Sequence, residues 1–156
     1  MMLRNTVFTI LLTFSAGLLA EEAVQRLPSA DGAKVGFSNL EDGAVVPPEF
    51  TVVFSIAGMG IAPAGVEIEN TGHHHLLIDV AQLPDFDQPL PASENIIHFG
   101  KGQSETRLEL SEGQHTLQLV LTDYRHLPHD PPVLSERITI TVSSDAPAQG
   151  EEQPEE

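Results

Sequence analysis

Apolar and polar residues alternate along two segments in the second half of the chain. In residues 116–121 leucine occupies every second position, and in residues 137–142 isoleucine or valine alternates with arginine or threonine. A period of two places the apolar side chains of a strand on one face. Both segments are therefore predicted to be β-strands with one buried face.

Five further segments are rich in β-branched or aromatic residues and are bounded by glycine, proline or other turn-forming residues. Pro or Gly punctuates nearly every gap, and no long window carries apolar residues at helical spacing. The pattern predicts an all-β fold, an immunoglobulin-like antiparallel β-sandwich spanning residues 34–142. Its strands, about seven in number, are expected at residues 34–40, 50–57, 73–80, 96–99, 105–110, 116–124 and 136–142.

The first twenty residues have the features of a secretory signal peptide. Arg4 gives a positive start, residues 7–19 form a largely apolar run, and Ala20 ends it. The run has 13 residues, whereas a membrane-spanning helix needs about 20. We expect residues 1–20 to be cleaved off and the mature protein to lie in the periplasm or to be secreted, without a membrane anchor.

Two segments flank the predicted domain. Residues 21–33 lack periodicity and are interpreted as a leader to the domain. Residues 143–156 contain no large apolar side chain and include five acidic residues. This composition is typical of a disordered acidic tail.

The charge of the chain is strongly negative, because 7 Lys and Arg stand against 23 Asp and Glu, a formal net charge of −16. Such a surface repels nucleic acid and anionic lipid, attracts cations and favours solubility. The absence of cysteine excludes disulfides and thiolate ligands. A soluble protein without a nucleic-acid or membrane partner is expected.

All seven histidines lie between residues 73 and 129. On a strand, His73 and His75 would share one face, with α-carbons roughly 6.5–7 Å apart, close enough for two imidazoles to converge on one ion. His74 would share the opposite, more apolar face with Leu76 and Ile78, and is interpreted as a hydrogen-bonded core residue.

An assumed sandwich topology brings more distant side chains to the same pole. If segment 73–80 pairs antiparallel with segment 116–124, the start of the first lies beside the end of the second. Segment 96–99, antiparallel on the other edge, would return to the same place. The predicted metal ligands are His73, His75, His98 and His129, with His126 or Asp123 as substitutes. His115 would lie at the opposite pole, and Asp79 too far along its strand to help.

Imidazole and carboxylate ligands without thiolate suit Zn(II), Cu(II) or Ni(II). The residues alone leave a purely structural histidine network open, in which the imidazoles hold loops by bonding backbone carbonyls. Glu67 and Glu69, in the long connection 58–72, could support the same pole from a solvated loop.

Three ordered motifs, in residues 71–79, 98–105 and 113–121, are followed by Asp123, His126, Pro128 and His129. Together they resemble the bacterial periplasmic domain of unknown function 4399 family over about residues 35–142. The resemblance implies export, one domain and a sandwich fold, and it identifies no catalytic residue.

The sequence thus predicts an exported protein that binds a divalent transition-metal ion through histidines, without catalysis. The alternative is a structural or protein-interaction module of the cell envelope, whose histidines brace loops and whose pole docks another envelope protein. An enzyme that activates water at an open three-histidine site is a third hypothesis.

Overall fold

The structure, a computed structural model, describes residues 24–147. The predicted signal peptide and the end of the predicted acidic tail lie outside the described residues. Within them the fold is built from ten strands: β1 (Lys34–Phe37), β2 (Val45–Val46), β3 (Glu49–Ala57), β4 (Gly60–Ile61), β5 (Thr71–Ile78), β6 (Ile96–His98), β7 (Glu105–Glu109), β8 (Gly113–Thr122), β9 (Pro128–Leu134) and β10 (Ile138–Val142).

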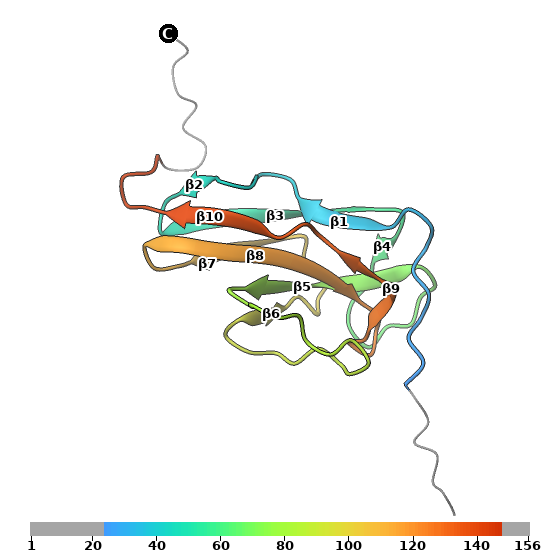
Figure 1. The fold of residues 1–156 in the computed structure, drawn as a ribbon. Coiled ribbons are helices and arrows are strands. Elements are labelled where there is room, and N and C mark those ends of the chain that lie inside the picture. Colours follow the sequence, from blue (N-terminus) through green and yellow to red (C-terminus); the bar gives the residue numbers. More distant parts are fainter. Residues whose placement is uncertain (1–23, 148–156) are drawn as a thin grey trace, which may run out of the picture.

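The strands form two sheets. The smaller has the order β1-β3-β7, and the larger has the order β2-β10-β8-β5-β4, with β6 paired to β5 and β9 paired to β8. Figure 1 shows β10, β8, β5 and β6 side by side, with β3 and β7 behind them. The predicted all-β sandwich is confirmed, and each of the seven predicted segments contains a strand.

The short strands β2 and β4 and the proline-containing β9 were not predicted. Both β2 and β4 pair in parallel, with β10 and β5 respectively, so the larger sheet is mixed rather than purely antiparallel. The immunoglobulin-like detail of the topology stays a prediction.

The main core lies between the two sheets. Val52 and Phe54 of β3 face Leu76 of β5 and Leu119 of β8, in a cluster whose buried members are at most 8% exposed. The alternation of apolar and polar residues that predicted the strands is what creates this inner layer.

A second, smaller cluster covers the outer face of the larger sheet. Leu77 of β5, Ile96 of β6 and Val120 of β8 pack there against Leu90, which belongs to the connection between β5 and β6. Both faces of β5 are therefore buried, which explains why seven of its eight residues are buried. The described part of the chain includes no helix long and apolar enough to cross a membrane.

Candidate metal centre

The histidine triplet lies on β5, where neighbouring side chains point to opposite faces of the sheet. His74 points into the main core, with its ring centre 5.1 Å from that of Phe54. It is a core residue, as predicted, although its Nδ1 atom has no hydrogen-bond partner among the described residues. His73 and His75 lie on the outer face, and both are fully buried.

Strand pairing brings His98 and Thr122 beside these two histidines. In the antiparallel pair β5–β6, His98 is directly opposite His75, and in the antiparallel pair β5–β8, Thr122 is directly opposite His73. Both pairings agree with the topology assumed from the sequence. Directly opposed side chains on one face of a sheet lie about 5 Å apart at Cβ, which is close enough for contact.

A tight loop between β8 and β9 supplies a further imidazole, from His126. The loop is organised by Asp123, whose Oδ1 accepts hydrogen bonds from the backbone N–H groups of Arg125 (2.7 Å) and Leu127 (3.0 Å). Its Oδ2 accepts bonds from Nε (3.0 Å) and Nη2 (2.7 Å) of Arg125. Asp123 thus holds the backbone that carries His126.

His126 itself has a positive φ of 71°. This left-handed conformation is uncommon for a residue with a side chain, and such outliers persist only where the surroundings enforce them. The loop hydrogen bonds of Asp123 provide that enforcement, and they direct the imidazole of His126 onto His73, at 5.0 Å between ring centres.

Four imidazoles, those of His73, His75, His98 and His126, form one compact group. Their six ring-centre separations run from 4.7 Å to 6.0 Å. Four imidazoles around a tetrahedral zinc ion, with Zn–N bonds of about 2.1 Å, have ring centres about 5.2 Å apart. The spacing of the four rings therefore matches that of imidazoles around a single ion.

The ligand nitrogens are close together as well. One nitrogen each from His73, His98 and His126 lies within 4.8 Å of the other two. Around a tetrahedral ion these nitrogens would be roughly 3.4 Å apart. Side-chain rotations that move each nitrogen by about an ångström would therefore bring the three nitrogens to the spacing of metal ligands. His75 lies outside this set of three, and its ring stacks on that of His98 at an interplanar angle of 27°.

The buried hydroxyl of Thr122 links two of the imidazoles. Its Oγ1 lies 3.1 Å from Nε2 of His73 and 3.2 Å from Nδ1 of His75. The carbonyl oxygen of His73 lies 3.5 Å from the same Oγ1. If both imidazoles donate to this oxygen, as its two lone pairs allow, the remaining nitrogens, Nδ1 of His73 and Nε2 of His75, carry lone pairs.

Those two nitrogens, together with Nε2 of His98, are buried and have no hydrogen-bond partner in the described part of the chain. Buried polar atoms are nearly always paired in proteins, because leaving one unpaired costs about 1–3 kcal/mol. Three unpaired nitrogens in one cluster indicate a missing partner that accepts lone pairs.

Three of the four imidazoles in the cluster also have a lowered pKa. Burial, together with repulsion from neighbouring histidines, lowers the pKa of His73 to about 4 and that of His75 to about 3 from the ordinary 6.5. Burial and His126 also lower the pKa of His98. Neutral imidazoles are the form that coordinates a metal ion, so the metal-free site is ready to bind at neutral pH.

Gly100 gives the His98 ring its space, because a Cβ atom at this position would overlap Cε1 and Nε2 of the ring. We expect Gly100→Ala to displace His98 and to weaken metal binding about tenfold, with little loss of stability because only a side chain must move. Calorimetric titration and thermal unfolding of the same variant would measure both quantities. Unchanged affinity would show that His98 is not a ligand.

The remaining predicted site residues lie elsewhere. His129, on β9, is buried and lines a separate pocket with Glu67 and Glu69. Asp123 uses both carboxylate oxygens within its own loop. His115 lies at the other end of β8, as predicted, where Nδ1 is 2.7 Å from the Asp79 carboxylate.

Thr122 and Gly100 were missed by the sequence analysis. The assumed pairing of segments 73–80 and 116–124 could have identified Thr122, because it places that hydroxyl opposite the triplet. No comparable signal marks Gly100, since its role depends on the position of the His98 ring.

The family model of a domain of unknown function, DUF4399, matches residues 52–143. The chain belongs to this family. All four clustered histidines lie within the matched DUF4399 region, so the cluster is part of the domain itself. No curated protein and no solved structure matches the chain.

Proposed function

We propose that this DUF4399 protein binds one divalent transition-metal ion through His73, His98 and His126, with His75 beside the ion. The observation that carries the proposal is the convergence of one ring nitrogen each from His73, His98 and His126. Two of these residues, His73 and His98, also have a buried ring nitrogen without a hydrogen-bond partner in the described part of the chain. A bound cation would accept their lone pairs and remove the cost of leaving them unpaired.

Ligand chemistry narrows the choice of ion. The candidate donors are imidazoles, which suit Zn(II), Cu(II) and Ni(II), whereas Ca(II) and Mg(II) prefer oxygen. Among the three, Cu(II) is expected to bind most tightly, because divalent affinities peak at copper for such ligands.

The cluster favours binding over catalysis. His73 and His75 are fully buried, and only the side of the partly exposed His98 and His126 could admit a substrate, whereas hydrolysis needs room for one at an open coordination position. We place the working protein in the periplasm or outside the cell, on the strength of the signal-like residues 1–20. The acidic chain would help to concentrate cations near the site.

Isothermal titration of the untagged protein with Zn(II), Cu(II) and Ni(II) tests the proposal. We expect one-to-one binding, tighter than micromolar for at least one ion. His126→Gly should weaken it at least tenfold. Glycine adopts the positive φ of this position readily, so the substitution removes the imidazole without straining the loop.

The matched control is His115→Gln, which removes an imidazole at the far end of β8 and should leave the affinity unchanged. Binding no tighter than micromolar, or equal loss in both variants, would reject the metal site. The alternative of a structural or protein-interaction module, with the histidines as packing, would then be favoured.

A further inference from the structure

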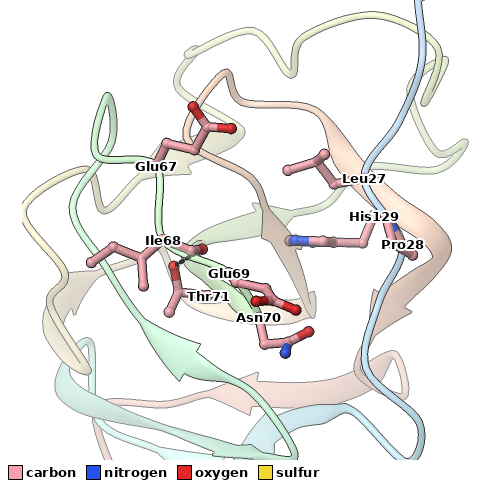
Figure 2. Close-up of a pocket in the computed structure, with 8 residues that line it drawn as sticks. All are labelled: Leu27, Pro28, Glu67, Ile68, Glu69, Asn70, Thr71 and His129. Carbon is pink, nitrogen blue, oxygen red and sulfur yellow. Dashed lines mark hydrogen bonds between the residues drawn. The ribbon is translucent and has the colours of Figure 1, made fainter.

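A second candidate site lies at a pocket of about 220 Å³ that is separate from the histidine cluster. Figure 2 shows the pocket between the N-terminal segment, the connection that leads into β5, and β9. Three of its lining residues, Leu27, Pro28 and Ile68, are apolar, and the others are Glu67, Glu69, Asn70, Thr71 and His129.

The wall formed by the N-terminal segment is firmly attached. Arg26 donates hydrogen bonds from its guanidinium to the backbone carbonyls of Pro128 and His129. Asp130 donates its backbone N–H to the carbonyl of Leu27 at 2.8 Å, and Pro28 forms a bridge with Asp130. The pocket is therefore a preformed feature of the fold.

A buried histidine points into this pocket. Figure 2 shows the imidazole of His129 reaching from β9 into the space between Leu27 and Glu69. The residue is 2% exposed, and its Nδ1 atom has no hydrogen-bond partner among the described residues. Burial lowers the pKa of His129 by more than hydrogen bonding to the backbone of Leu121 and Thr71 raises it, so the neutral ring is favoured and one of its nitrogens keeps a lone pair.

Two carboxylates stand at the same pocket. Glu67 and Glu69 are exposed, and neither forms an ion pair with a described residue. Asn70, which follows Glu69 and also lines the pocket, adopts a positive φ of 55°. A ligand in this pocket would therefore meet one imidazole, two negative charges and apolar side chains, in the presence of the positive charges of Arg26, which acts on His129, and Arg125, which acts on Glu67.

We propose that the pocket binds a primary ammonium group carried on a short aliphatic chain. An ammonium group has three N–H donors and no acceptor, which matches an imidazole lone pair and carboxylate oxygens. Leu27, Pro28 and Ile68 would contact the methylene chain, and the volume accommodates four or five carbons. The ligand could be a free amine or a lysine side chain of a partner protein, since the recognised chemistry is the same.

The test uses the untagged, metal-free protein and amide chemical shifts of Glu69, Asn70 and Thr71. The probes are n-butylamine, Nα-acetyl-lysine amide and, as the neutral analogue, n-butanol. We expect saturable shifts with the two amines and at least fivefold weaker binding of n-butanol. Equal affinity of the amines indicates a free amine as ligand, and tighter binding of the lysine derivative indicates a protein partner.

Two variants assign the binding to this pocket. Glu69→Gln should weaken amine binding about two- to fivefold, the effect of removing one exposed ion pair. His129→Phe, which keeps the ring and removes its nitrogens, should weaken it about three- to tenfold. Glu94→Gln removes an equal charge from an exposed position outside the pocket and should change nothing.

Equal binding of n-butanol, or equal loss in Glu69→Gln and Glu94→Gln, would overturn the proposal. Because the probes contain no metal and the variants leave the histidine cluster intact, this result is independent of the proposed metal function.

Discussion

Acidifying the metal-free protein from pH 7 to pH 5 is expected to lower its free energy of unfolding by about 5 kcal/mol, a large part of the stability of a typical domain. The cause is the burial of His73, His74 and His75. Burial holds the pKa of His73 and His74 near 4 and, with the neighbouring histidines, that of His75 near 3.

The direction follows from proton uptake. Above the ordinary pKa of 6.5 these histidines are neutral in both states and contribute no pH dependence. Below it the unfolded chain takes up protons that the folded chain does not, until the pH reaches the folded pKa values. Each histidine therefore costs about 1.4 kcal/mol per pH unit, or roughly 2 kcal/mol by pH 5.

Urea unfolding at pH 7, 6 and 5 in the presence of a chelator would measure this loss. His74→Leu removes one buried imidazole from the core face and should reduce the loss by roughly 2 kcal/mol. A free energy of unfolding that stays constant between pH 7 and pH 5, in both proteins, would contradict the burial of neutral imidazoles.

His115→Gln is the informative control, because His115 acts in the opposite sense. Its partial burial lowers its pKa, but the hydrogen bonds to Asp79 and to the Ser111 carbonyl, together with the negative charge of Asp79, outweigh this and raise the pKa overall. His115 therefore stabilises the fold below pH 6.5, and that contribution is lost as the pH rises through the folded pKa. Removing the imidazole should make the acid loss steeper.

Much of the fold could be predicted because alternation has a direct physical cause. A strand with only one face on the core must place apolar residues at every second position, and β8 and β10 do so. The antiparallel pairing of β5 with β8 then brought His73 to the end of β8. Strand β9 was not predicted because it contains Pro131 and Pro132, which cannot donate backbone hydrogen bonds to a neighbouring strand and so argue against a strand in the sequence.

The choice between His126 and His129 could not be made from their spacing. The register shifts between Leu121 and Thr122 where β8 pairs with β9, which changes the faces to which the following side chains point. The positive φ of His126 directs that imidazole to the cluster, and His129 enters the separate pocket instead. Neither the irregular register nor the sign of φ is encoded in a local pattern of apolar residues.

Removing the hydroxyl of Thr122 is expected to weaken metal binding by about 10- to 100-fold, the usual effect of losing a group that orients a metal-binding histidine. Thr122→Val keeps the shape of the side chain and removes the oxygen that lies within 3.2 Å of both imidazoles. Without it, no described residue fixes which ring nitrogen of His73 or His75 carries the proton.

The effect has a signature that requires no metal. In the metal-free wild type, nitrogen chemical shifts should show the proton of His73 on Nε2 and that of His75 on Nδ1, so that both donate to Thr122. In Thr122→Val each ring should show a mixture of the two tautomers. Thr122→Ser retains the hydroxyl and should retain both the proton positions and most of the affinity.

Metal affinity and the histidine tautomers together show whether Thr122 orients the imidazoles or only packs against them. If Thr122→Val unfolds at the same temperature as the wild type but loses affinity and shows mixed tautomers, Thr122 acts by orienting the imidazoles. If affinity and tautomers are unchanged, the hydroxyl has no role in the site. A third result is that the wild-type protein binds no metal but has the expected proton positions. Thr122 would then connect the imidazoles of a purely structural histidine network, because the same hydrogen bonds would stabilise the fold without a metal ion.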